Sequence, residues 1–145
     1  MAIPDLDTVR TFFARAPFVV DIGIQAEAVG DGEITTSIAL EPRHLQHSGQ
    51  VHAGVMATMA DHTAGAAAQM MAAEGELILT AEMKLSLLRA AKGERLVCRA
   101  RVLKPGRRVS FVEADVWCRA GDGSEQHVAR FSATMAIVPM PPQAA

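Results

Sequence analysis

The segment from Ala53 to Ala73 constrains the fold of this 145-residue chain more than any other stretch of the sequence. It contains no proline, and its strong helix formers alanine and methionine outweigh the cost of Gly54 and Gly65. The segment therefore predicts one long helix. Apolar residues surround that helix on almost every side, which is typical of a buried helix rather than an amphipathic surface helix.

Segments with alternating apolar and polar residues lie on both sides of this helix. Residues 18–30 and 33–40 predict two strands that are joined at Gly30-Asp31-Gly32, a good tight-turn sequence. Residues 77–88 resume the period of two after the helix. Their expected apolar face consists of Leu79, Ala81, Met83, Leu85 and Leu87.

A hairpin is expected around Lys104-Pro105-Gly106, followed by a last strand at residues 127–138. The hairpin has one charged face, on which Arg99 and Arg101 are expected to pair with Glu113 and Asp115. Its apolar face contains Leu96, Cys98, Ala100, Val102, Val112, Ala114, Val116 and Cys118. The two cysteines fall out of register, which conflicts with the roughly 7 Å limit between disulfide-bonded Cα atoms, so we expect free buried thiols.

The order of these elements predicts an α+β domain that spans residues 1–145, with a mostly antiparallel sheet around the long helix. A helix at about residues 5–16 is expected to precede the first strand and to end at Pro17. Residues 139–145 are expected to form a frayed tail. One sheet of this size leaves a face partly uncovered, so we expect a homodimer with paired sheets.

Charge and hydropathy exclude several classes of partner. The formal net charge of −2 gives no support for a nucleic-acid partner. The N-terminus is acidic where a signal peptide needs a positive region. No uncharged apolar stretch approaches the roughly 20 residues of a membrane span. We therefore expect a cytoplasmic protein without a membrane partner.

Asp61 is a carboxylate inside the apolar helix, where burial costs several kcal/mol unless the charge is paired or neutralised. Its neighbours at helical spacing are all small: Gly54, Ala57, Thr58, Ala64, Gly65 and Ala68. Two interpretations of this small-residue stripe are open. It packs closely against other elements while a hydroxyl or a partner arginine caps Asp61, or it leaves room for a ligand.

His52, Ala53 and Gly54 lie at the expected start of the same helix. The first turn of a helix has unpaired backbone N–H groups and the positive end of the macrodipole, which together suit a developing oxyanion. Gly54 would allow a ligand to approach the backbone closely. The alternative is that His52 is a loop residue that merely precedes a helix.

The sequence "QHSGQVHAGVMATMAD" resembles the N-x-x-G-x-x-H-G-G-x-x-x-x-(L/M)-x-D pattern of hotdog-fold acyl-CoA thioesterases of the phenylacetate-pathway (PaaI-like) type, within the 4-hydroxybenzoyl-CoA thioesterase superfamily. The resemblance continues through "TAEMKLSLLRAAKGERLVCRARVLKPGRRVSF" and covers about residues 18–138. Gly49, His52, Gly54, Met59 and Asp61 match the pattern in register. The resemblance implies a hotdog fold.

The resemblance also implies roles for individual residues. Asp61 would be the catalytic carboxylate, which activates water or attacks the thioester itself. The amides of Ala53 and Gly54, in a turn shaped by His52 of the other protomer, would polarise the carbonyl. Thr80 would position the attacking water. Further residues are expected to contact the substrate: His47 and Thr58 in the pocket, and Lys104, Arg107 and Arg108 at the coenzyme A phosphates, unless their turn is simply solvated.

Two positions depart from the pattern. Gln46 stands where the family has asparagine and adds a methylene, and Ala53 replaces the first glycine of the usual pair and adds a methyl group. These changes motivate an alternative hypothesis, in which the protein binds acyl-CoA without hydrolysing it. The leading hypothesis is an acyl-CoA thioesterase that assembles as a homodimer or homotetramer with active sites at the protomer interface.

Other chemistries lack their signatures. His52 and Asp61 are nine residues apart, whereas zinc-ligand pairs are usually three to five apart, so no metal or other cofactor is expected. His44 is a loop residue, and His62 points about 100° away from Asp61 around the helix, which argues against a catalytic dyad. No serine lies in a G-x-S-x-G motif, and no hydratase motif is present.

Overall fold

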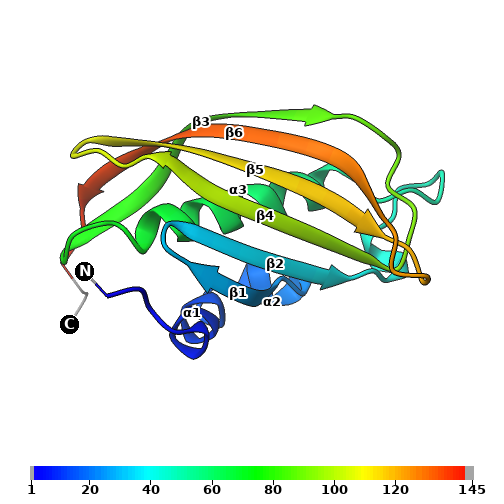
Figure 1. Cartoon of the computed structure of the whole chain (residues 1–145), viewed down its shortest axis with the longest axis horizontal. Helices are drawn as coiled ribbons and strands as arrows, with labels where there is room; N and C mark the ends of the chain where they lie inside the picture. Colours follow the sequence, from blue (N-terminus) through cyan, green and yellow to red (C-terminus); the bar gives the residue numbers. More distant parts are fainter. Residues whose placement is uncertain (1, 143–145) are drawn as a thin grey trace.

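A six-stranded antiparallel sheet curves over one side of a single long helix in the computed structural model, which describes residues 2–142 (Figure 1). The helices are α1 (Leu6–Phe13), α2 (Pro17–Ile22) and α3 (Ala53–Gln69), with a short 3-10 helix at Pro42–His44. The strands are β1 (Gln25–Gly30), β2 (Glu33–Ala39), β3 (Glu76–Leu87), β4 (Arg95–Lys104), β5 (Val109–Arg119) and β6 (Glu125–Pro139). Their order in the sheet is β1-β2-β4-β5-β6-β3, which confirms the expected α+β class.

The core lies between α3 and the inner face of the sheet. Alanines of α3, among them Ala60, Ala64 and Ala67, are fully buried and allow the helix to approach the strands closely. The predicted apolar face of the hairpin is confirmed, because Leu96 pairs with Cys118 and Ala100 with Ala114. Among the described residues no helix is both apolar enough and long enough to cross a membrane.

Two threonines link the helix to the sheet inside this core. Thr36 of β2 and Thr63 of α3 are fully buried, and their hydroxyl oxygens lie 2.8 Å apart. The Thr63 hydroxyl also lies 2.6 Å from the carbonyl of Met59. Both cysteines are free and buried, as expected, and burial raises the pKa of Cys98 to about 12, so this thiol is unreactive.

The expectation of a strand from residue 18 was wrong, because residues 17–22 form α2 and the strand begins only at Gln25. Contrary to expectation, Pro17 does not end the first helix but opens the second, since its fixed φ and missing N–H suit the first position of a helix. Gly23 then ends α2 in a left-handed conformation, with φ of 87°. The first helix is also shorter than expected, ending at Phe13.

The long helix ends at Gln69, four residues earlier than predicted. The side chain of Gln69 bonds the backbone of the following strand, with Nε2 donating to the Glu76 carbonyl and Oε1 accepting from Ile78. These bonds hold the chain as it reverses through Gly75 into β3. The expected frayed tail begins later than predicted, because β6 continues to Pro139 and the Met140 N–H donates to Gly75, while 143–145 lie outside the described residues.

The apolar face predicted for β3 was only partly correct, because a bulge interrupts the strand at Ala81. Thr80 pairs with Met135, and the next pair is Glu82 with Thr134. The extra residue shifts the alternation by one position. Thr80 therefore faces α3, on the same side of the sheet as Met83, Leu85 and Leu87, whereas Leu79 does not.

The charged face of the hairpin also differs in part from its prediction. Arg101 pairs with Glu113, as expected. Arg99 instead pairs with Glu125 of β6, at 3.0 Å, because Asp115 is engaged by Arg130 and His127. The ion pairs of the outer face therefore extend across three strands.

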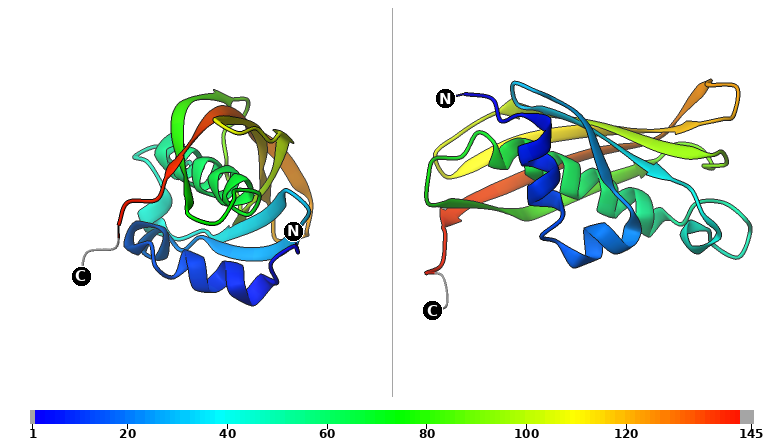
Figure 2. Two further views of the ribbon diagram at one scale, coloured as in Figure 1. Left: turned by 90° about the vertical axis from the view of Figure 1, so that its left-hand side faces the viewer. Right: turned by 90° about the horizontal axis from the view of Figure 1, so that it is seen from below.

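The N-terminal helix covers α3 from the side that the sheet leaves open (Figure 2). Phe13 of α1 packs edge-on against the His62 ring, with 4.4 Å between the ring centroids, and Phe12 stacks on the same ring at 6.5 Å. The Nε2 atom of His62 is buried and has no hydrogen-bond partner in residues 2–142. Burial lowers the pKa of His62, although the charge of Asp61 acts in the opposite direction.

This lowered pKa predicts a loss of stability in mild acid. The unfolded chain binds a proton at His62 near its ordinary pKa of 6.5, whereas the folded chain resists protonation, so the stability present above that pH falls below it. We expect the melting temperature of the native protein to fall more between about pH 7.5 and pH 5 than that of His62→Gln. His47→Gln, which alters an exposed histidine, serves as the control. Parallel pH courses for the native protein and His62→Gln would contradict the prediction.

Candidate functional site

Asp61 lies on the side of α3 that faces the first half of β3. The Thr80 hydroxyl donates a hydrogen bond of 2.7 Å to its Oδ1 atom and also contacts the sulfur of Met135 at 3.4 Å. The bulge at Ala81 produces this contact, because it turns Thr80 toward the helix. The carboxylate is thus capped by a hydroxyl, as one interpretation of the sequence proposed, but Asp61 stays half-buried.

The small residues around Asp61 leave open space. Ala57, Thr58 and Gly65 are only partly buried, and a side chain built on Gly65 would meet no atom within 4 Å. The stripe is therefore not packed against another backbone of the same chain at this point. Thr58 uses its hydroxyl within the helix, where it donates to the Gly54 carbonyl at 2.8 Å.

His52 caps the start of α3. Its Nδ1 atom accepts a hydrogen bond of 2.8 Å from the Gly54 N–H, and a side chain at Gly54 would lie 2.9 Å from that nitrogen. Glycine at position 54 therefore admits the His52 ring. The two amides that the sequence proposed as oxyanion donors are not equivalent, because Gly54 is engaged by His52, whereas the Ala53 N–H has no partner within the described chain.

A pocket of about 310 Å³ lies between the start of α3 and the end of β3. Gln46 and Ala53, the two residues that depart from the family pattern, both line it. Apolar side chains, including Met56 and Leu87, form much of the remaining wall. Arg89 also lines the pocket and donates to the His127 carbonyl at 3.0 Å, a position that the sequence analysis missed because no motif marks it.

Gly54 and Asp61 lie on nearly the same face of α3, seven residues apart. A rise of 1.5 Å per residue places them about 10 Å apart along the helix axis. A single thioester carbonyl is too small to contact both positions. Within one chain, the helix start and the carboxylate therefore do not form one site.

The basic turn between β4 and β5 lies at the other end of the molecule from the helix start (Figure 1). A series of contacts connects this turn to the end of α3. The Ile137 N–H donates to the Arg108 carbonyl, and Ile137 of β6 pairs with Ile78 of β3. The Ile78 N–H in turn donates to the side chain of Gln69, the last residue of α3. Exposed Lys104, Arg107 and Arg108 are therefore near the C-terminal end of α3. His47 is exposed in the loop before α3, where it lies outside the pocket of Gln46.

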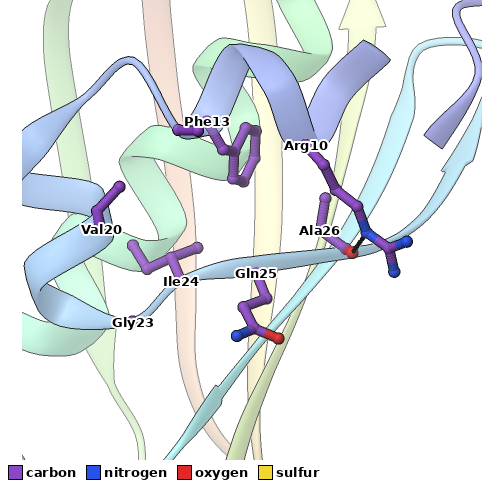
Figure 3. Close-up of a pocket in the computed structure, with 8 residues that line it drawn as sticks. Arg10, Phe13, Val20, Gly23, Ile24, Gln25 and Ala26 are labelled. Atoms are coloured by element: carbon purple, nitrogen blue, oxygen red, sulfur yellow. Dashed lines mark hydrogen bonds between the residues drawn. The ribbon is translucent and has the colours of Figure 1, made fainter. Parts of the chain in front are cut away.

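A separate pocket of about 360 Å³ lies between α1, α2 and β1 (Figure 3). Phe13, Val20 and Ile24 form its apolar wall, and Arg10 lies at its edge, where Nε donates to the Ala26 carbonyl at 3.2 Å. None of the residues that the sequence proposed for the site lines this pocket. This pocket is therefore distinct from the regions of Asp61 and the start of α3.

The fold is thus an antiparallel sheet around one central helix, and a carboxylate lies in the middle of that helix. The chain belongs to the thioesterase superfamily, whose model matches residues 48–124. The structure is similar to that of a thioesterase family protein from Silicibacter pomeroyi, with 32% identity, a TM-score of 0.87, and coverage of 92% of this chain and 97% of the other.

Two further crystal structures share the fold at lower identity. A thioesterase from Haemophilus influenzae is 18% identical, with a TM-score of 0.84 over 98% of this chain and 96% of the other. A mutant thioesterase from Pseudomonas aeruginosa is 22% identical, with a TM-score of 0.83 over 94% and 96%. The expected hotdog fold is confirmed. Membership of this superfamily supports thioester hydrolysis as the general class of reaction.

The cap at the start of α3 predicts a stability effect. His52→Ala removes the acceptor for the Gly54 N–H, and loss of an N-cap costs about 0.5–2 kcal/mol. We expect a lower urea midpoint with an unchanged slope, measured by circular dichroism. His47→Ala, in the same loop, should leave the midpoint unchanged, and an unaltered midpoint for His52→Ala would show that the cap contributes nothing.

Proposed function

We propose that this protein is an acyl-CoA thioesterase of the phenylacetate-pathway type, with Asp61 as general base or nucleophile. The observation that carries the proposal is the half-buried Asp61 carboxylate, which Thr80 orients at 2.7 Å beside open space on α3. Such a carboxylate has one oxygen fixed and the other available for chemistry. The proposed reaction needs no metal or other cofactor.

The chemistry follows from the positions of the charges. Asp61 takes a proton from water as the water oxygen attacks the thioester carbon, or attacks that carbon directly and is released by water. The carbonyl oxygen becomes an oxyanion, and the free Ala53 N–H at the positive end of α3 would stabilise it. The carbon–sulfur bond then breaks, and the coenzyme A thiolate receives the proton.

Two copies of the chain would complete the site. About 10 Å of helix separates Asp61 from the start of α3, so the amide is proposed to come from a second protomer. A two-fold axis opposite Ala57 and Thr58 would place Asp61 of each copy at the helix start of the other. The β3 edge supports this arrangement, because it has no neighbouring strand in the described chain and leaves Met83 and Leu87 46% and 54% exposed.

The same symmetry gives the remaining substrate contacts. It would bring the basic turn with Lys104, Arg107 and Arg108 near the other protomer's helix start, where coenzyme A phosphates would meet it. The acyl chain or pantetheine would enter the pocket of Gln46 and Ala53. We propose a homodimer or a tetramer of two such dimers, in the cytoplasm, because buried free thiols fit a reducing compartment.

Replacement of the carboxylate tests the proposal directly. Asp61→Asn keeps an acceptor for the Thr80 hydroxyl but removes the base, so we expect hydrolysis to fall about 100- to 10,000-fold. The measurement is thiol release from a panel of short, medium, long and aryl acyl-CoA substrates. Asp31→Asn, in an exposed turn, is the matched control. Retention of native activity by Asp61→Asn would refute the assignment.

The Ala53 amide can be removed without breaking the helix. Proline is tolerated at the first helical position, and the preceding His52 already has the extended conformation, with ψ of 135°, that proline requires. We expect Ala53→Pro to fold and to lose about 100- to 1,000-fold in kcat. Ala53→Gly keeps the N–H and should remain active. Equal activities for the proline and glycine variants would exclude this amide as an oxyanion donor.

Co-expression of Asp61→Asn with Ala53→Pro tests the shared site. Half of randomly formed dimers contain one chain of each kind, and each mixed dimer has one intact site of two, so about a quarter of the native activity should return. Rescue requires that the two groups come from different chains. No rescue in mixed dimers, isolated with two affinity tags, would place the whole site within one chain.

The alternative is a protein that binds acyl-CoA without hydrolysing it. One observation favours it: His52 engages the Gly54 amide, so at the helix start the Ala53 N–H alone has no partner among residues 2–142. A binding protein would be stabilised thermally by acyl-CoA and would release no thiol from any member of the panel. A hydrolase would release thiol in an Asp61-dependent manner.

A further inference from the structure

Two arginines lie directly opposite each other on the outer face of the sheet. Arg95 of β4 pairs in register with Arg119 of β5. Like charges at opposed positions of an antiparallel pair destabilise the sheet. Both side chains lie on the same charged face of the hairpin, so the sheet does not separate the two guanidinium groups.

Neighbouring acids compensate only part of this charge. Glu125 accepts from Arg119 at 3.2 Å and from Arg99 at 3.0 Å, so one carboxylate serves two guanidinium groups. Burial raises the pKa of Glu125, but hydrogen bonds from the two arginines outweigh it and lower the pKa overall, which keeps the carboxylate ionised. Arg95 forms no ion pair within the described residues and donates instead to the Ser37 hydroxyl at 2.9 Å.

These arginines border a groove of about 340 Å³, here called the outer-face groove. Its polar lining consists of Glu27, Thr35, Ser37, Arg95, Arg99 and Arg119. Val97 also lines it, and Val97 and Ser37 are buried at 3% and 2% exposure. The Ser37 hydroxyl accepts from Arg95 and donates to Glu27, which fixes the Arg95 guanidinium.

We propose that the outer-face groove binds a phosphate group, carried by inorganic phosphate or by a small phosphate ester. A phosphate between Arg95 and Arg119 would replace their repulsion by two attractive contacts. Guanidinium groups match phosphate oxygens in geometry, and the Thr35 hydroxyl adds a further donor in the same groove. Three arginines against Glu27 and Glu125 leave one net positive charge for the anion.

The groove is separate from the proposed active site. Thr35 and Ser37 of β2 point outward, whereas Thr36 between them points inward and bonds Thr63 of α3. The sheet therefore lies between the groove and the helix that carries Asp61. Binding in the groove can consequently be tested without any assumption about hydrolysis.

The test is thermal denaturation of the native protein at low ionic strength, with phosphate, glycerol 3-phosphate or chloride at matched ionic strength. We expect a melting temperature about 2–4 °C higher in the two phosphates than in chloride. Arg95→Gln should melt at or above the native temperature in chloride, because it removes the opposed charge, and should show no rise in phosphate. Thr35→Val should reduce the rise.

Arg15→Gln, which removes the same charge from the exposed turn after α1, is the matched control and should keep the full rise in phosphate. A rise with inorganic phosphate alone assigns the groove to the free anion, and a rise with both assigns it to phosphate groups in general. Equal stabilisation by chloride, or a full phosphate response in Arg95→Gln, would overturn the proposal. A lost response in Arg15→Gln would also overturn it, since the effect would then be non-specific.

Discussion

The close contact between α3 and the inner face of the sheet is the constraint on which the structure depends. Alanines at the contact, fully buried, let the helix backbone approach the strands, where larger side chains would hold it away. The sheet curves over one side of the helix only. Asp61 lies on a less buried side of α3, toward β3, together with the partly buried Ala57 and Gly65.

Regular alternation made much of the sheet predictable. The hairpin of β4 and β5 follows it on the core face from Leu96 to Val102 and from Val112 to Cys118, so the pairing and burial of these segments were visible in the sequence. Beyond Val102 a bulge shifts the register. The segment at residues 17–22 was not, because β-branched residues favour a strand, whereas Pro17 and Gly23 set the ends of a helix. The strand propensity of the side chains was therefore outweighed by the backbone conformations of Pro17 and Gly23, which suit the start and the end of a helix.

The candidate site was predictable in its residues but not in its geometry. The bulge at Ala81 leaves no clear trace in the sequence, because apolar residues continue on both sides of it, yet it decides that Thr80 faces Asp61. The cap by His52 was also hidden, since it depends on the ring folding back over Gly54. The second amide at the helix start is therefore occupied by the His52 imidazole rather than absent.

The pair of buried threonines has a consequence for the direction in which Asp61 points. Thr63 is two residues from Asp61 and therefore about 200° around the helix, on the side that faces the sheet. Rotation of α3 about its axis would separate the two hydroxyls and leave Thr36 without this partner in the core, at about 1–3 kcal/mol, while Thr63 would keep its bond to the Met59 carbonyl. A polar contact on the hidden side of the helix thus acts as a rotational lock for the carboxylate on the open side.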